Sequence, residues 1–130
     1  MKKIYFLLLC ALAMTSCQES LQDRAEREAK EYTKKYCPMV KEEQVLTLDS
    51  LTFEKSTSTF IYYYTVIGAS ADQDNINKNK DKIRNNLIMT LHDDTSQKTY
   101  KDAGFSYRHI MISQIDGSVL FDTTLKKENY

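Results

Sequence analysis

The chain of 130 residues has only three glycines, one proline and three cysteines, and it has no tryptophan. So few glycines leave little from which to build a phosphate-binding loop, and no Gly-x-Gly-x-x-Gly, P-loop or nucleophile-elbow pattern is present. The scarcity of proline and glycine excludes collagenous and low-complexity chains, and the scarcity of cysteine excludes a disulfide scaffold. The 18 basic and 18 acidic side chains balance, with no basic block. This distribution excludes the usual pattern of a nucleic-acid-binding protein.

Long hydrophobic runs are also scarce, apart from one near the N-terminus. Met1-Lys2-Lys3 precedes an uncharged run over residues 4–14, which is too short for a transmembrane helix of about 20 residues. A basic start, a short apolar run and small residues before a polar chain are typical of an export signal. Ala11-Leu12-Ala13 would allow cleavage to a soluble protein that begins at Met14. Met14-Thr15-Ser16-Cys17, by contrast, resembles a bacterial lipobox.

We favour the lipobox, because cleavage after Ala13 would leave an apolar run at the short end of the usual range of about 7–15 residues. The predicted domains are therefore a lipoprotein signal peptide over residues 1–16 and one folded domain over 17–130. The lipobox resemblance implies that Cys17 carries the lipid and attaches the protein to the membrane. Gln18 follows it in place of Asp, which in similar lipoproteins implies the outer membrane or the periplasmic side of the envelope.

Cysteine counting leaves one thiol in the mature domain. Cys10 leaves with the signal and Cys17 is acylated, so Cys37 has no internal disulfide partner. Cys37 is either a small buried hydrophobe where a helix ends before Pro38, which we favour, or a reactive thiol that serves as a nucleophile or in an intermolecular disulfide.

Two amphipathic helices are predicted. The first runs from Ser20 to Tyr36, where apolar residues recur every three or four positions, Ser20 suits the cap and Lys34 and Lys35 suit the C-terminal end of the helix dipole. The second covers Ile76 to Leu91, with a polar stretch before it that includes residues 72–75. We interpret those residues as a polar turn and not as a calcium loop, because the glycine and distal glutamate of such a loop are missing.

Four β-strands are predicted in two hairpins. The first pairs Gln44–Glu54 with Thr59–Ile67 across the turn Lys55–Ser58, and bulky side chains on both faces of the second strand predict a central position. A short helical stretch through Tyr100 and Ala103 should then end at Gly104. The second hairpin pairs Phe105–Ile112 with Ser118–Leu125 around Asp116-Gly117, and residues 126–130 are expected to fray.

The predicted fold class is therefore α+β. We expect a two-layer domain in which two main helices cover a four-stranded antiparallel sheet, in the order α-β-β-α-β-β.

Candidate sites are few. Tyr62, Tyr63 and Tyr64 could carry recognition of a protein, peptide or glycan, although β-propensity in a central strand explains them as well. His92, beside Asp93, is interpreted as a solvated helix end, and His109 as a packed residue. No ligand spacing for a metal is present, so we predict no metal site, no cofactor and no catalytic residue.

The order of short motifs resembles small uncharacterised exported proteins and lipoproteins of Gram-negative anaerobes. The motifs are Tyr36-Cys37-Pro38-Met39, Leu48-Asp49-Ser50-Leu51, Tyr62-Tyr63-Tyr64-Thr65 and the segment from Lys101 to Tyr107. The resemblance brings no activity, so it assigns no catalytic residue. The leading hypothesis is a lipid-anchored, non-enzymatic binding module of the cell envelope, of which an inhibitor or immunity lipoprotein would be one version. The alternative is a thiol-dependent enzyme that uses Cys37.

Overall fold

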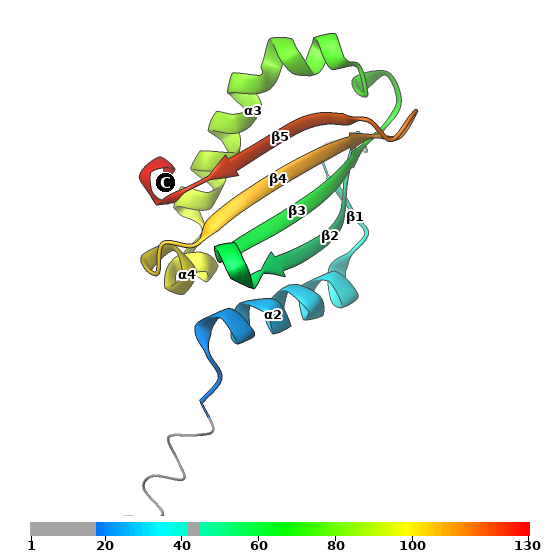
Figure 1. Ribbon diagram of the computed structural model, residues 1–130. Helices are drawn as coiled ribbons and strands as arrows, with labels where there is room; N and C mark the ends of the chain where they lie inside the picture. The colour runs from blue at the N-terminus through cyan, green and yellow to red at the C-terminus, as the bar shows by residue number, and fades with distance from the viewer. Residues whose placement is uncertain (1–17, 42–44) are drawn as a thin grey trace, which may run out of the picture.

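The computed structural model describes residues 18–41 and 45–130. The predicted signal peptide, Cys17 and Gln44 lie outside the described residues. Within these ranges the chain forms one mixed five-stranded sheet in the order β1-β2-β3-β4-β5 (Figure 1). Its strands are β1 (Met39–Lys41), β2 (Leu46–Glu54), β3 (Thr59–Val66), β4 (Ser106–Ser113) and β5 (Val119–Leu125). The helices are α2 (Leu21–Tyr36), α3 (Gln73–Asp93) and α4 (Lys98–Asp102).

The helix α2 begins and ends as its sequence predicts. The Ser20 side chain accepts a hydrogen bond from the backbone N–H of Asp23 at 3.1 Å, which satisfies one of the donors left open in the first turn. The small residues Ala25 and Ala29 are fully buried one helical turn apart. Because they lack bulky side chains, the helix lies close against β2.

The sheet differs from the prediction in two ways. A fifth strand, β1, pairs with β2, and three residues after a proline are too few for an alternating pattern to be recognised. The prediction of a wholly antiparallel sheet was also wrong, because β3 and β4 are parallel, with Thr59 opposite Ser106.

The length of α3 explains the parallel pairing. Its 21 residues span about 30 Å, which exceeds the about 26 Å of an eight-residue strand such as β3. The helix therefore returns the chain to the end at which β3 began, and β4 then runs in the same direction as β3.

The core lies between the helices and one face of the sheet. On β3, alternate side chains point toward the helices, and they are those of Phe60, Tyr62, Tyr64 and Val66. The opposite face carries Ile61 and Tyr63, so bulky groups occupy both faces, and the predicted central position of β3 is confirmed.

The C-terminal residues are packed, contrary to the prediction that they fray. Lys127–Asn129 form a short 3-10 turn, η5. The Tyr130 hydroxyl donates a hydrogen bond to the Phe105 carbonyl oxygen at 2.8 Å, and the Tyr130 ring meets Tyr107 edge-on at 5.8 Å. The predicted helix stop at Gly104 is confirmed, since its φ of +77° is readily reached only by a residue without a Cβ. Within the described ranges, the helices are too short or too polar to cross a membrane.

Candidate functional site

A groove of about 450 Å³ lies between α3 and the helix-side face of the sheet. Its floor is apolar and comes from three strands and the inner side of α3, through Leu46, Tyr64, Val66, Ile76, Ile83, Leu87 and Met111. Its rim is polar and consists of Lys41, Ser70, Asn75, Asn79, Lys82, Asn86 and Thr90, with Val45 beside them. An apolar floor with a few polar groups around it is the usual composition of a ligand-binding pocket.

The groove exists because the two long helices lie over different strands. The helix α2 packs on β2, whereas α3 contacts β5. Two side chains hold α3 in that place. Gln73 donates a hydrogen bond to the Leu120 carbonyl oxygen at 3.0 Å, and Arg84 donates to the Thr123 hydroxyl. The helix-side face of β3 and β4 near Val66 therefore lies at the bottom of the groove beside α3, where Val66 and Met111 are 4% and 5% exposed.

The groove side of α3 combines an apolar line and a polar line. Ile76 is buried, and Ile83 and Leu87 are half-buried, whereas the neighbouring amides are exposed. The side-chain nitrogen of Asn79 donates to the backbone carbonyl oxygen and side-chain oxygen of Asn75 at 2.8 and 3.1 Å. The charges among the described lining residues are those of Lys41 and Lys82, and no carboxylate is among them.

An aromatic stack supports the floor of the groove. The His109 ring lies parallel to that of Tyr62, with centroids 4.6 Å apart, and its Nδ1 is hydrogen-bonded to the Tyr64 hydroxyl at 3.0 Å. Burial lowers the pKa of His109 from 6.5 to about 4, because a charged imidazolium is poorly solvated there. Burial also raises the pKa of Tyr62. The stack is therefore neutral at physiological pH, and the packed role predicted for His109 is confirmed.

The three consecutive tyrosines are divided between the two faces of the sheet. Tyr64 is 7% exposed and lines the groove, and Tyr62 packs beside it against both core clusters. Tyr63 lies on the opposite face, across from Ile110 of β4. One partner therefore cannot contact all three rings on one face. Whether any of the three binds a ligand remains a prediction.

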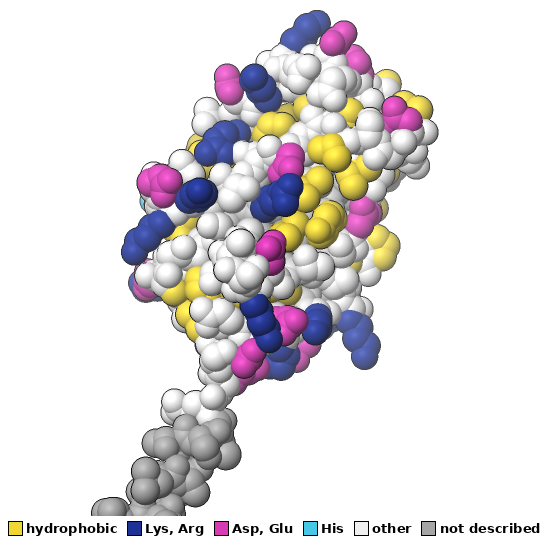
Figure 2. Space-filling model, in the orientation of Figure 1, with side chains coloured by type: hydrophobic (Ala, Val, Ile, Leu, Met, Phe, Trp, Pro, Cys, Tyr) yellow, Lys and Arg dark blue, Asp and Glu magenta, His cyan; other side chains and the backbone are white. Residues whose placement is uncertain are grey.

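The opposite face of the sheet carries an ion pair between Arg108 and Asp122. Figure 2 shows hydrophobic side chains gathered over the middle strands, with charged groups around them. Arg108 donates to both carboxylate oxygens of Asp122 at 2.9 and 2.6 Å, and Thr65 donates to Asp49 at 2.6 Å.

Cys37 lies at the C-terminal end of α2, where its backbone N–H bonds to the Thr33 carbonyl oxygen. It is half-buried, packs on the core cluster around Leu48 and is a free thiol. Burial, and then the nearby charge of Asp49, raise its pKa. Both effects disfavour the nucleophilic thiolate, so the surroundings of Cys37 favour a packing role.

The other candidates from the sequence are part of helix ends. Asp72 caps α3 by accepting a hydrogen bond from the Asp74 N–H at 3.2 Å, and His92 is exposed in the last turn of α3 with Asp93 at 3.0 Å. Among residues 18–41 and 45–130, no three His, Cys, Asp or Glu side chains are placed to hold a metal ion.

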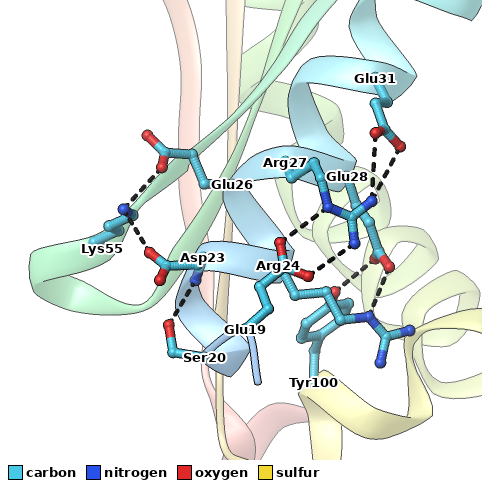
Figure 3. A network of polar contacts seen from close by, with 10 residues as sticks. All are labelled: Glu19, Ser20, Asp23, Arg24, Glu26, Arg27, Glu28, Glu31, Lys55 and Tyr100. Atoms are coloured by element: carbon cyan, nitrogen blue, oxygen red, sulfur yellow. Dashed lines mark hydrogen bonds and ion pairs between the residues drawn. The ribbon is translucent and has the colours of Figure 1, made fainter. Parts of the chain in front are cut away.

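The start of α2 matters because it follows the predicted lipidation residue. Arg27 donates to both carboxylate oxygens of Glu19 at 2.9 and 3.0 Å, and it also contacts Glu31 (Figure 3). This ion pair holds Glu19 against the first turns of α2. Only Gln18 then separates this ordered contact from Cys17.

The same network joins α2 to two other elements (Figure 3). Lys55, in the turn η2 (Lys55–Thr57), bridges Asp23 and Glu26 at 2.7 and 2.9 Å. Tyr100 of α4 donates to Glu28 at 2.6 Å. Exposed ion pairs contribute little stability singly, but together these contacts fix the beginning of α2 to the hairpin turn and to α4.

The fold and the groove together define a small two-layer α+β domain with an apolar groove on its helical face. This chain belongs to the family described as Domain of unknown function (DUF8479), whose model matches residues 20–121. No curated protein matches its sequence.

Solved structures share the fold at low sequence identity. The type II secretion system pilotin AspS from Vibrio cholerae has a TM-score of 0.63 at 19% identity, over 91% of this chain and 99% of that chain. The type 2 secretion system pilotin EpsS from Vibrio vulnificus has a TM-score of 0.63 at 14% identity, over 84% and 90%. A candidate secreted protein of Pseudomonas aeruginosa has a TM-score of 0.67 at 15% identity, over 86% and 98%.

Proposed function

We propose that this protein is a lipid-anchored lipoprotein of the cell envelope that acts without catalysis, by binding a partner protein in the groove between α3 and the sheet. The observation that carries the proposal is the groove itself. Its apolar floor and polar rim are suited to holding a ligand, and its volume of about 450 Å³ lies in the range of about 300–1,000 Å³ that is usual for small-molecule pockets, which leaves room for a few side chains of a partner protein.

The comparisons support a protein partner over a small molecule. Two proteins of the same fold are type II secretion system pilotins, and the third is a candidate secreted protein. By analogy, the partner of this chain would be another component of the envelope. The inhibitor or immunity role is a finer hypothesis that depends on identifying this partner.

The anchor would be the lipid on Cys17. Glu19 is tied to Arg27, so the domain would lie close to the membrane with the start of α2 facing it. Figure 1 places the start of α2 at one end of the domain and the start of α3, with the neighbouring ends of β1 and β3, at the other. The part of the groove around Asn75 would thus face away from the lipid and be accessible to a protein in the periplasm.

Catalysis by Cys37 is the weaker alternative. The thiol is half-buried and its pKa is raised, whereas a nucleophilic cysteine needs a lowered pKa.

Labelling and fractionation test the anchor. In the host, the wild type should incorporate fatty acid and sediment with the outer membrane, and Cys17→Ser should lose both properties. A Cys17→Ser protein that stays membrane-bound, or a wild type that begins at Met14, would refute the lipoprotein assignment.

Photo-crosslinking in the host tests the groove. A photoreactive amino acid at Lys82, which lines the groove, should form a discrete adduct with one envelope protein. The matched control is Asn85, which is exposed on α3 but does not line the groove. Equal adducts from both positions, or none from Lys82, would contradict a partner in the groove.

A further inference from the structure

The rim of the groove contains a row of polar side chains along α3. Asn75, Asn79, Lys82, Asn86 and Thr90 all line the groove and are exposed. Successive members are three or four residues apart, so they lie on one face of the helix. An apolar groove that bound its partner by hydrophobic contact alone would not need a row of amides.

The spacing of this row fits an extended peptide. Four helical residues rise by about 6 Å along the axis, and two residues of an extended chain advance by about 6.6 Å. Side chains one turn apart on α3 therefore meet every second residue of a chain that runs alongside the helix. Between Asn79 and Asn86 the helix rises by about 10.5 Å and four residues of an extended chain advance by about 13 Å, so the two spacings agree to within about 3 Å over this pair.

The chemistry of the row agrees with its spacing. An Asn side chain both donates and accepts hydrogen bonds, and each residue of an extended chain presents one N–H and one C=O on its backbone. The side-chain nitrogen of Asn79 already donates to Asn75, so the Asn79 side-chain oxygen would accept from a backbone N–H of the partner. A helical partner would have satisfied nearly all of its backbone groups internally. A row of amides can therefore pair with the backbone of an extended partner but with little of a helical one.

The charges that line the groove indicate which side chains the partner would carry. Lys41 stands on the strand side and Lys82 on the helix side. An acidic side chain would gain from both cations. The aliphatic floor around Val66 and Met111 would accept the alternate side chains that point inward.

We propose that the groove binds an extended, acidic segment of its partner protein, whose backbone pairs with Asn79 and Asn86 while alternate aliphatic side chains enter the floor. This inference rests on the proposed function and specifies the conformation and chemistry of the segment that is bound. If the groove bound a helix instead, this inference would be wrong and the proposed function would still hold.

Peptide selection tests the proposal directly. The protein is purified from membranes in mild detergent and used to select from a displayed library of random peptides of about 16 residues, which is long enough for a helix to form. We expect enriched peptides to alternate aliphatic and polar residues, with at least one acid. Affinity for them should fall about tenfold in the double variant Asn79→Leu and Asn86→Leu, since each amide contributes one or two hydrogen bonds.

Asn85→Leu is the matched control, because it makes the same change on α3 outside the groove. Leucine favours a helix more than asparagine does, so lost binding would not mean lost folding, and unfolding temperatures verify this. Lys82→Glu should shift the selection from acidic to basic peptides.

N-methylation of the enriched peptide gives a readout that shape or hydrophobicity would not produce. Two methylated peptides are compared, one methylated at every odd-numbered backbone nitrogen and the other at every even-numbered one. Binding should be about tenfold weaker for one of them and nearly unchanged for the other, because only one set of N–H groups faces α3.

Three outcomes would overturn the proposal. One is enrichment of apolar residues at helical spacing, which would leave a protein-binding groove but reject an extended partner. A second is an equal loss of affinity for the two methylated peptides. The third is the absence of any enrichment over the double variant. In that third case the Lys82 crosslink decides whether the proposed function also fails.

Discussion

Protonation of His109 should limit the acid stability of this domain. The imidazole is 7% exposed, stacked on Tyr62 and bonded to the Tyr64 hydroxyl. Its hydrogen bond can persist on protonation, since both ring nitrogens of an imidazolium donate and the Tyr64 hydroxyl can accept. The cost of protonation is therefore the burial of a charge among aromatic rings.

The size of this effect follows from the pKa values. The ordinary pKa of 6.5 applies to the unfolded chain, and the folded value is about 4. Between these values the unfolded state binds the extra proton, so the free energy of unfolding falls by up to about 1.4 kcal/mol per pH unit as the pH falls. The contribution is fully present above pH 6.5 and lost by about pH 4, a total of about 3 kcal/mol.

Chemical denaturation between pH 7 and pH 4 measures this loss. His109→Gln removes the titrating group and retains an amide that can bond to Tyr64, so it should flatten the curve in this window even if it is less stable at pH 7. Should that variant fold poorly, His109→Phe keeps the ring stack and serves the same purpose. His92→Gln removes the exposed histidine and should keep the wild-type curve. Parallel curves for the wild type and His109→Gln would refute the reasoning.

Three further predictions concern single side chains. The Thr33 hydroxyl both donates to the Leu51 carbonyl oxygen and accepts from its N–H, each at 2.8 Å, so Thr33→Val should cost about 1–3 kcal/mol of unfolding free energy and Thr33→Ser much less. A smaller effect of Val than of Ser in denaturation would contradict this. Cys37 should react with iodoacetamide more slowly in the folded protein than in urea at pH 7, because its pKa is raised; rapid stoichiometric alkylation of the folded form would revive the thiol enzyme. Tyr64→Ala should lower stability by about 3–5 kcal/mol as a large core truncation, and Tyr63→Ala, on the other face, by clearly less; equal losses would place both rings in one core.

The Thr33 contact shows why one part of the fold was not predicted. β1 pairs with β2 only as far as Leu48, and beyond that point Thr33 of α2 takes over the backbone groups of Leu51. A strand of three residues is too short to show a recognisable alternation in the sequence. A side chain that bonds to the backbone of a strand in place of a neighbouring strand has no sequence pattern either. Both are contacts between segments far apart in the chain.

The candidate site was predicted only in part. Tyr64 was singled out for its aromatic character, and it does line the groove, but Tyr62 and Tyr63 do not share its position. The row with Asn79 and Asn86 was not predicted, because exposed polar side chains on an amphipathic helix are expected whether or not they line a groove. Its spacing of three and four residues was visible in the sequence, but the position of the sheet beside it was not.

The sequence by itself determined the features that depend on residues close to one another along the chain. The Ser20 cap, the alternation along β3, the Gly104 stop and the class of α+β domain all follow from residues a few positions apart. Only the tertiary structure decided the parallel pairing of β3 with β4 and the position of α3 over β5. The physical reason is that strand order and the gap between two helices depend on which long-range contacts close together, and amphipathic patterns specify that a face is buried without specifying against what.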